Sequence, residues 1–369
     1  MKFRRTYKYR LFPTKAQRTL LKDTLNNCRM LYNAALQERS EAWKKQHISI
    51  NYYAQANQLV EAKAAFEPLK TVNAQVLQDT LRRCDKSFQG FFRRSKRGEK
   101  SGYPRFQSKT RYNSFTYPQG GFKLVKDRLK LSKIGSVPIE MHRPLQGSQV
   151  KTLSIKRDGD FWYACFSCEI EHTPPGNLVS VETIGIDVGI EHFATLSDGS
   201  VIENPKLFRK AEANLACLAR RFSKRKTRRR AKALRKAHRK VKNQRLDFHH
   251  QQSAALIKRF GTIAVEKLNI KPMVQQSHFA KSISDAGWGR FLDFLAYKAE
   301  WAGVRFVKIP AAGTSQTCPE CGQVKKKTLQ QRWHSCDCGC EMHRDHASAA
   351  VILALGLQSL GKIPRSPGL

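Results

Sequence analysis

The sequence predicts a multidomain protein of the α+β class, and three features lead to that prediction. Residues 14–95 carry apolar side chains at helical spacing, residues 102–172 form short alternating runs separated by turns, and from residue 181 strand patterns alternate with helix patterns. Mixed segments of this kind fold as separate layers with cores of their own. A length of 369 residues is sufficient for two to three such domains.

The charge of the chain indicates a polyanionic partner. Lys and Arg number 68 against 29 Asp and Glu, a formal net charge of +39. A folded protein tolerates such self-repulsion chiefly beside a polyanion, so nucleic acid is the first candidate and a membrane surface the second. No apolar run is long enough to cross a bilayer. Ten cysteines without a secretion signal indicate a reducing, cytoplasmic location, where metal binding is favoured over disulfides.

The N-terminal segment is expected to begin with one strand and to continue as helices. Residues 2–12 alternate basic with aromatic or aliphatic side chains and stop at a proline. Thr14 and Gln17 have the spacing of a capping box, and a helical apolar pattern follows them. Further helices are expected over about 52–66 and about 72–94.

Residues 102–172 predict a β-barrel or a β-sandwich that the first strand completes. The run KRDGD at 156–160 marks a hairpin turn. Cys165 and Cys168 have C-x-x-C spacing, but residues i and i+3 of a strand point to opposite faces, so both are predicted to be packing residues. A linker is expected at 173–180.

The second half predicts the order strand–strand–helix–strand–helix–strand–helix. Asp187 lies inside the apolar run 184–190, where a carboxylate without a partner is costly. Residues 206–246 contain 18 Lys/Arg and one acidic residue, which predicts one or two long helices that face a phosphate backbone. The polar segment 273–284 is predicted to be mobile.

A cysteine cluster near the C-terminus has the spacing of a zinc ribbon. Five of the ten cysteines fall within 23 residues, and paired spacing argues against ordinary core packing. The thiolates that fit the two knuckles of a tetrahedral Zn²⁺ site are Cys318, Cys321, Cys336 and Cys338. Cys340 is then a spare thiol, because Gly339 provides the tight turn that favours Cys338.

Three carboxylates lie where an RNase H-like fold would gather them at one edge of a sheet. Asp187 is on the first strand of the second half, Glu266 ends a later parallel strand, and Asp345 begins the last helix. Two Mg²⁺ ions could bind there, one activating water and one stabilising the leaving oxygen. The helix dipole would keep Asp345 ionised, although an ordinary helix N-cap is the simpler alternative for this residue alone.

The ordered set of motifs resembles the TnpB family of transposon-encoded, RNA-guided DNA endonucleases, which is related to the type V CRISPR effectors. The matching segments are YKYRLFPTKAQ (7–17), GYPRF (102–106), GIDVGI (185–190), AVEKLN (264–269), SISDAGWGRF (282–291), TSQTCPECG (314–322) and CG-x₄-RD (338–345). The resemblance covers nearly the whole chain. Two departures are Ser348, where the family usually has Asn, and the extra Cys340.

The resemblance implies a wedge β-barrel with a helical insert, followed by an RNase H-like (RuvC) α/β nuclease with a zinc-ribbon insert. The implied domains are the wedge barrel at 1–13 and 101–180, a helical recognition insert at 14–100, the nuclease at 181–312 and 341–357, a nucleic-acid-binding zinc ribbon at 313–340, and a tail at 358–369.

The resemblance also implies partners, cofactors and residue roles. Asp187, Glu266 and Asp345 match the family's catalytic, Mg²⁺-binding residues, and the four ribbon cysteines match its zinc ligands. The implied partners are a guide RNA from the transposon end and double-stranded target DNA with a short flanking motif, with no membrane. The expected location is a prokaryotic cytoplasm, at the nucleoid.

Two groups of residues are expected to hold nucleic acid. Gln75 and Gln78 carry amides suited to reading adenine edges in the flanking motif, although ordinary solvent-facing polar residues explain them equally well. The phosphate contacts are expected from Arg228, Arg229, Arg230, Arg235, Arg239 and Lys240.

Together these features predict an RNA-guided, Mg²⁺-dependent endonuclease that cleaves double-stranded DNA beside a short motif. One alternative is a nuclease-inactive, RNA-guided repressor, which would usually have lost one of the three acidic residues that this chain retains. The other is a strand-joining transposase, which fits the fold but not the family. The guide RNA rests on the resemblance alone.

Overall fold

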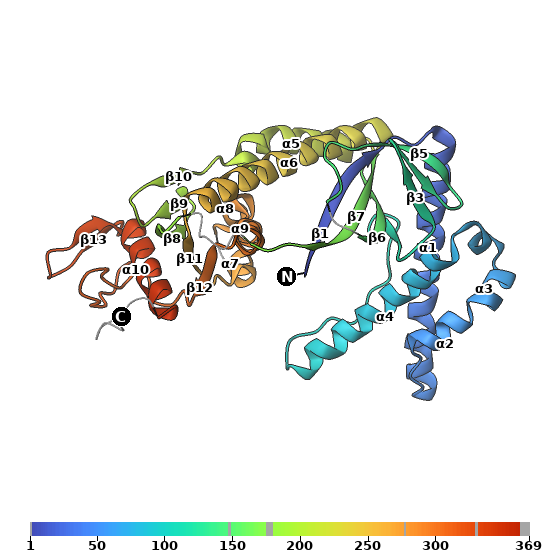
Figure 1. Ribbon diagram of the computed structural model, residues 1–369, viewed down its shortest axis with the longest axis horizontal. Coiled ribbons are helices and arrows are strands. Elements are labelled where there is room, and N and C mark those ends of the chain that lie inside the picture. The colour runs from blue at the N-terminus through green and yellow to red at the C-terminus, as the bar shows by residue number, and fades with distance from the viewer. Residues whose placement is uncertain (1, 147–148, 175–179, 277, 329–330, 362–369) are drawn as a thin grey trace. The chain divides into compact units, whose positions relative to one another are not determined.

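The computed structural model describes residues 2–146, 149–174, 180–276, 278–328 and 331–361 (Figure 1). Its internal contacts divide the chain into two compact units, Met1–His172 and Thr173–Leu369. The finer division into five domain ranges stays a prediction, and most of the expected linker at 173–180 lies outside the described residues. No described helix is both long and apolar enough to cross a membrane.

In the N-terminal unit a strand leads into helices, as predicted. Thr14 and Gln17 form the predicted capping box at the start of the first helix. The helix expected over 52–66 is wrong in one respect, because the chain forms two short helices there. Buried Gln55 donates to Ala35 O at 2.9 Å and so ties the first of them to α1, a tertiary contact that apolar spacing does not reveal. The elements are β1 (Lys2–Leu11), α1 (Lys15–Gln46), α2 (Tyr52–Asn57), α3 (Leu59–Ala65), the 3₁₀ helix η1 (Glu67–Thr71) and α4 (Ala74–Lys96).

The β-rich segment forms one seven-stranded sheet in the order β2-β6-β7-β1-β5-β4-β3. The first strand completes this sheet, because β1 pairs antiparallel with β7 from Lys2↔Glu171 to Leu11↔Trp162. The predicted hairpin turn joins β6 to β7 through Gly159, which has φ 62°. The remaining strands are β2 (Ser114–Tyr117), β3 (Phe122–Val125), β4 (Arg128–Leu131), β5 (Gly135–Glu140), β6 (Gln149–Asp158) and β7 (Phe161–Glu171).

The predicted closed barrel is instead an open sheet. Strands β2 and β3 are consecutive in the sequence but lie at the two ends of the strand order, and no backbone pairing among the described residues joins them. Their side chains meet, with 6.3 Å between the ring centroids of Tyr117 and Phe122. Gly121 has φ 86°, and a Cβ there would lie 2.9 Å from the Tyr117 ring. The tight turn therefore packs against Tyr117. Strands β2 and β3 contact each other through aromatic side chains and not through backbone hydrogen bonds.

The two cysteines of β7 are packing residues, as predicted. Cys168 is buried and Cys165 is partly exposed, in agreement with opposite faces of the strand. Neither belongs to a group of described side chains that could hold a metal ion.

The C-terminal unit contains a five-stranded mixed sheet in the order β10-β9-β8-β11-β12. Strand β11 pairs parallel with both β8 and β12, whereas β8, β9 and β10 are antiparallel neighbours. This is the sheet expected of an RNase H-like fold. Its strands are β8 (Thr183–Val188), β9 (His192–Leu196), β10 (Val201–Glu203), β11 (Thr262–Glu266) and β12 (Arg305–Ile309).

The basic run forms two long helices that pack against each other, in agreement with the sequence (Figure 1). The polar segment 273–284, which was predicted to be mobile, contains most of α7 and α8, and Ile283 packs into the core. The last helix continues to Ser359 and so includes the first two residues of the expected tail, and residues 362–369 lie outside the described residues. The elements are α5 (Leu207–Lys224), α6 (Arg228–Arg259), α7 (Ile270–Gln276), α8 (Ala280–Ala286), α9 (Trp288–Ala302), β13 (Trp333–Ser335), β14 (Glu341–His343) and α10 (Arg344–Ser359).

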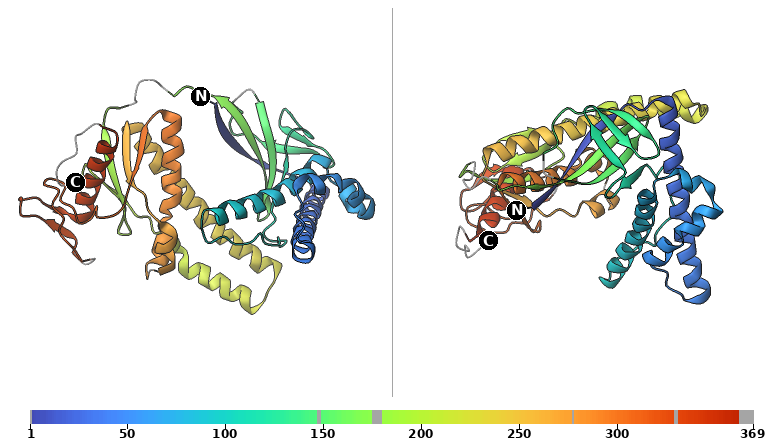
Figure 2. Two further views of the ribbon diagram at one scale, coloured as in Figure 1. Left: turned by 90° about the horizontal axis from the view of Figure 1, so that it is seen from below. Right: turned by 45° about the vertical axis from the view of Figure 1, so that its right-hand side comes forward.

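Helices cover both faces of this sheet, with α9 and α10 on opposite sides (Figure 2). The α9 face buries Ile184, Ile186 and Val265 in the main core. On the other face the last helix approaches unusually closely. A Cβ at Gly185 would lie 2.1 Å from the carbonyl oxygen of Ala349, and only glycine leaves room for such contact. The helix is therefore held at a fixed depth over β8.

We expect Gly185→Ala to destabilise the protein strongly. The added methyl group meets the backbone of α10, which cannot rotate away, and overpacking of this kind costs about 3 kcal/mol or more at the severe end. Urea unfolding measures the loss. The matched control is Gly289→Ala in α9, where the nearest atom is the flexible Cδ1 of Ile270 at 3.1 Å. Equal unfolding midpoints for both variants would contradict the close-packing account.

Candidate nuclease site and cysteine cluster

Asp187 and Glu266 lie side by side at the carboxyl ends of two parallel strands. The last pair in register between β8 and β11 is Ile186 with Val265, and each acid is the next residue along its strand. Side chains alternate along a strand, so both acids share the face opposite the main core, which is the face that α10 covers. The fold therefore directs both carboxylates toward the last helix.

Asp345 approaches the same place from α10. The N-cap of this helix is His343, whose Nδ1 accepts a hydrogen bond from Asp345 N at 3.3 Å. Asp345 therefore lies in the first turn and is not the N-cap, so the simpler alternative is wrong. Nε of the neighbouring Arg344 donates to Asp345 Oδ1 at 3.4 Å. The carboxylate is held near the positive end of the helix dipole.

Electrostatics show that the three acids form one cluster. Burial and then the charges of Glu266 and Asp345 raise the pKa of Asp187 well above its usual value, while Arg344 and a hydrogen bond from Ser348 oppose the rise. Burial likewise raises the pKa of Glu266, and the hydrogen bond from Thr314 opposes it. A like charge has this effect only at short range. A cation between the carboxylates would relieve the repulsion.

The donor set fits a hard divalent cation in an open site. Carboxylate oxygens are the ligands that Mg²⁺ prefers, and Mg²⁺ usually keeps several waters instead of a full protein cage. Within the described ranges, the groups of ligand atoms that all lie within 4.8 Å of one another are built on cysteines. The ligand atoms of the three carboxylates therefore do not all lie within 4.8 Å of one another, a wider spacing than that of a closed cage.

Sequence reasoning missed two residues that support this cluster. The Thr314 hydroxyl is buried and donates to Glu266 Oε1, so it fixes the orientation of that carboxylate. Arg344 directly precedes Asp345 and balances the acidic charge. Thr314 opens the matched segment TSQTCPECG, and Arg344 belongs to CG-x₄-RD, so both stood in motifs that had already been identified. Ser348, noted only as a departure, contacts Asp187.

The four predicted thiols of the ribbon lie together. The Sγ atoms of Cys318 and Cys338 are 3.7 Å apart, and those of Cys321 and Cys336 are 3.5 Å apart. Zinc–sulfur bonds of about 2.3 Å in a tetrahedron place sulfur atoms about 3.8 Å apart, so the spacing fits Zn²⁺. Gly339 has φ 89°, which provides the turn that was expected after Cys338.

The spare thiol has its own neighbours. Cys318, His334 and Cys340 form a second group whose ligand atoms lie within 4.8 Å of one another. His334 is fully buried and its Nε2 has no hydrogen-bond partner in the described part of the chain. The choice of Cys338 over Cys340 as fourth ligand stays a prediction, and His334 is a further candidate that the sequence reasoning did not name.

The predicted phosphate contacts lie on the long basic helix. Arg228 and Arg229 are exposed at its first turn, whereas Arg230 donates to Arg221 O at 2.8 Å. Cations at the positive end of a helix dipole are unfavourable, so an external anion would stabilise this end. Farther along the same helix, the exposed pair is Arg235 and Lys240, and the partly buried member is Arg239.

The two glutamines of α4 differ in their surroundings. Gln75 is partly buried, and its Oε1 accepts a hydrogen bond from Gly120 N at 3.0 Å. Reading an adenine edge uses both the oxygen and the nitrogen of the amide, so Gln75 would have to release this contact. Gln78 is exposed and keeps both groups for a partner. The hypothesis now rests mainly on Gln78.

Asp285 is a buried acid whose role the sequence did not reveal. Its carboxylate accepts hydrogen bonds from Phe208 N at 2.8 Å and Arg209 N at 3.3 Å, and it pairs with Arg245 at 3.1 Å. Phe208 and Arg209 open α5, whose own N-cap residue, Lys206, provides no side-chain cap. Asp285 therefore caps α5 from α8 and also binds α6, which fastens the basic helix pair to the nuclease sheet.

The fold and the acidic cluster define a nuclease of the RNase H-like class. Comparisons with known proteins agree with this class. Residues 288–352 match the family model described as "Cas12f1-like, TNB domain", and residues 166–277 match the model described as "Probable transposase". A third model, described as "Helix-turn-helix domain", matches residues 1–47, although that segment forms one strand and one long helix here.

Full-length relatives establish the family. The chain is 33% identical over 367 residues to "Putative RNA-guided DNA endonuclease" of Streptomyces pristinaespiralis, covering 96% of this chain and 90% of that protein. It is 30% identical to "Putative RNA-guided DNA endonuclease InsQ" of Escherichia coli (strain K12), covering 89% and 85%. The chain belongs to the TnpB family of RNA-guided DNA endonucleases.

A solved structure supports the fold. The chain resembles the protein of "Cryo-EM structure of the Cas12f1-sgRNA-target DNA complex" with a TM-score of 0.60 and 14% sequence identity, covering 95% of this chain and 98% of that one. At this identity the likeness concerns the fold alone.

We expect Asp285→Ala to loosen the basic helix pair. The change leaves two backbone amides without their acceptor and Arg245 without its partner, a loss of about 2–3 kcal/mol for a buried group of this kind. Hydrogen exchange of the α5 amides should accelerate, and the urea midpoint should fall. Asp293→Ala in α9 is the matched control, because that acid is exposed. Unchanged exchange in α5 would show that Asp285 does not hold the helix.

Proposed function

We propose that this protein is an RNA-guided, Mg²⁺-dependent endonuclease, encoded by a transposon, that cleaves double-stranded DNA beside a short flanking motif. The observation that carries the proposal is the convergence of Asp187, Glu266 and Asp345 from two parallel strand ends and one helix start. The family relationship supplies the guide RNA and the DNA substrate, because the relatives are named as RNA-guided DNA endonucleases.

The carboxylates would hold Mg²⁺ against the scissile phosphate. When bound there, Mg²⁺ would supply the activation of water as the nucleophile and the charge stabilisation of the leaving oxygen. Asp187 and Glu266 sit on rigid strands, so they fix the place of the reaction, and Thr314 keeps Glu266 in one orientation. Asp345 provides the third oxygen donor from α10. Arg344 offsets part of the negative charge and so lets a phosphodiester approach.

The basic helices would hold the nucleic acid by its phosphates. The run 206–246 has many cations and one acid, and both helices are well formed. Counterion release makes such contacts strong but insensitive to base sequence. Arg228 and Arg229 are the first choices among them, because they are exposed at an unfavourable helix end.

A zinc ion held by Cys318, Cys321, Cys336 and Cys338 would stabilise the segment that leads into α10. The ribbon strand β14 ends at His343, which is also the N-cap of that helix. Asp345 follows two residues later. The ribbon would therefore help to position Asp345. Zinc would then affect catalysis indirectly, by keeping this carboxylate in place.

The alternatives are separated by simple assays. A nuclease-inactive repressor would bind guided DNA and leave it intact with Mg²⁺ present, which is at odds with the retention of all three acids. A strand-joining transposase would insert a labelled DNA end into a plasmid. Cleavage without joining supports the proposed function.

We expect Asp187→Ala, Glu266→Ala and Asp345→Ala each to abolish DNA cleavage while guide and target binding stay almost normal. Loss of a metal ligand removes several kcal/mol of transition-state stabilisation, a rate loss of about a thousandfold. Plasmid cleavage and gel-shift assays measure the two properties. Near-normal cutting by any one variant would exclude that residue from the site.

Asp187→Asn provides the control for folding. Because the pKa of Asp187 is raised in the folded state, its contribution to stability is present at low pH and is lost as the pH rises through that pKa. Ionisation of this acid therefore opposes folding when no cation is bound. The Asn variant should therefore melt above the wild type in EDTA, and Mg²⁺ should narrow the difference. A lower melting point would assign the lost cleavage to misfolding.

We expect Cys318→Ser to lose about one zinc per chain and to destabilise the C-terminal unit. Structural zinc contributes on the order of 10 kcal/mol to folding a small ribbon, so the variant should unfold at lower temperature. Cys340→Ser is the matched control and should keep the metal. Metal analysis that finds no zinc in the wild type, or equal loss in both variants, would refute this assignment of ligands.

A further inference from the structure

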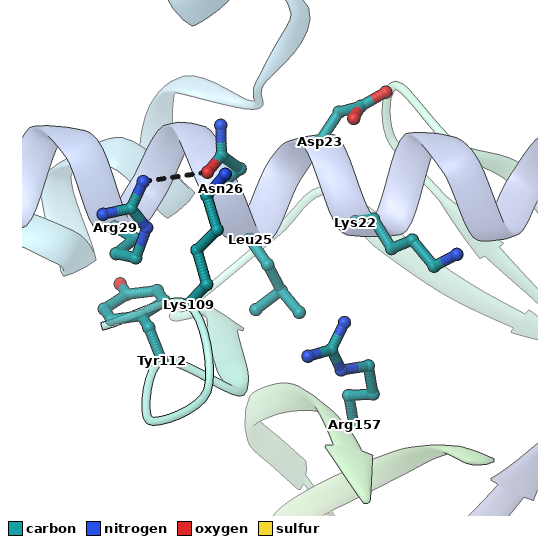
Figure 3. Close-up of a pocket in the computed structure, with 8 residues that line it drawn as sticks. All are labelled: Lys22, Asp23, Leu25, Asn26, Arg29, Lys109, Tyr112 and Arg157. Carbon is teal, nitrogen blue, oxygen red and sulfur yellow. Dashed lines mark hydrogen bonds between the residues drawn. The ribbon is translucent and has the colours of Figure 1, made fainter. Parts of the chain in front are cut away.

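A pocket in the N-terminal unit gathers positive charge and has no assigned role (Figure 3). It has a volume of about 320 Å³ and lies between α1, the turn before β2 and the end of β6. Asp23 is its one acidic lining residue, and Figure 3 shows it pointing away from Arg157. The cations that line the pocket are Lys22, Arg29, Lys109 and Arg157.

The positive charge of this pocket is poorly compensated. None of the ion pairs among the described residues of this unit includes Lys22, Lys109 or Arg157. Arg29 donates to Asn26 Oδ1 at 3.0 Å, but its Nε is buried and has no hydrogen-bond partner in the described chain. A buried guanidinium donor without an acceptor is costly, and neighbouring like charges add to that cost. An anion bound in the pocket would accept hydrogen bonds from the guanidinium and would offset the repulsion between the cations.

The walls of the pocket are fixed by contacts of their own. The side chain of Asn33 bonds the backbone N and O of Gln107 at 2.8 and 3.1 Å, which anchors the turn to α1. Tyr112 is buried, and Arg157 N donates to Asn113 O at 2.8 Å. The backbone positions that carry Lys109 and Arg157 are therefore fixed relative to α1 before any ligand arrives, which lowers the entropy lost on binding.

We propose that this pocket binds a phosphodiester group of a nucleic-acid strand, with the attached sugar or base against Leu25 and Tyr112. The inference rests on the proposed function in one respect, because that function makes nucleic acid the partner. Arginine forks match phosphate oxygens and lysines add charge without strict geometry. The edges of Leu25 and Tyr112 that line the pocket provide apolar contact for the uncharged part of a nucleotide.

The strand could come from the guide RNA or from the target DNA, since both share the phosphodiester. The shared chemistry requires only phosphate oxygens and an apolar ring or sugar. The experiment therefore compares oligouridine RNA and oligothymidine DNA of equal length, and includes duplex DNA as a third probe.

The test is the salt dependence of binding by the full chain with Lys22→Gln, Lys109→Gln and Arg157→Gln combined. Each neutralised phosphate contributes about 0.7 to the slope of log affinity against log salt for a single strand, so loss of the one phosphodiester held in the pocket should lower the slope by about 0.7. The matched control removes the same charge at exposed positions outside the pocket, with Lys44→Gln, Lys123→Gln and Lys130→Gln. The control should leave the slope almost unchanged.

Each outcome decides the proposal. A fall of about 0.7 for one probe, against an unchanged slope for the control, supports the pocket and identifies that probe's class as the source. Equal slopes for the pocket variant and the control, or no change in either, overturn it. The single variant Lys109→Glu is the control for misfolding. The Lys109 side chain is exposed, so this variant should fold normally and should still weaken binding of the same probe. A Lys109→Glu protein that binds like the wild type also overturns the proposal.

Failure of the pocket is distinguishable from failure of the proposed function. The pocket variant keeps all three carboxylates, so it should still cleave at saturating guide and low salt. The Asp187→Ala protein should show the reverse, with normal salt slopes and no cleavage. A pocket without a phosphate role thus leaves the nuclease assignment intact.

Discussion

The close contact between α10 and strand β8 is the constraint on which the candidate site depends. Gly185 leaves the helix backbone no room to move, and Gly356 allows a similar approach to Ala264 on β11, where an added Cβ would lie 2.5 Å from the Ala264 Cβ. These contacts place Asp345 beside two carboxylates that lie about 160 and 80 residues earlier in the chain. If α10 lay farther from the sheet, Asp345 would move away from the other two carboxylates. The close packing at the two glycines is therefore a condition for the carboxylate cluster.

The same arrangement stores electrostatic repulsion that a cation would relieve. The mutual charge of the acids and their burial raise the pKa of Asp187, and Arg344 offsets only part of this effect. The buried carboxylate of Asp285 has a different environment, because backbone amides donate hydrogen bonds to it and Arg245 forms an ion pair with it. The contrast separates an acid that stabilises the fold from acids that destabilise it. Clustered carboxylates of this kind suit a metal-dependent site.

The sequence predicted those features that local pattern encodes. Asp187 stood out as a carboxylate in an apolar strand, and the capping box at Thr14 and the cysteine spacing were equally local. The errors arose where distant residues decide the structure. Asp285 caps a helix 77 residues away from its own position, and the strands on either side of Gly121 approach without pairing, so the barrel stays open. The helices at 273–284 were missed because their few apolar residues contact a core that no local window contains.

Bound RNA is proposed to direct cleavage by the three-carboxylate site. The most direct measurement is to sequence the RNA that co-purifies with the protein, replace its targeting segment, and map cuts on plasmids that carry either the original or the new matching sequence. We expect cleavage to move to the new sequence, to require Mg²⁺, and to stay beside the same flanking motif. Cutting at an unchanged site whatever the RNA, or guided binding without any cutting, would contradict it.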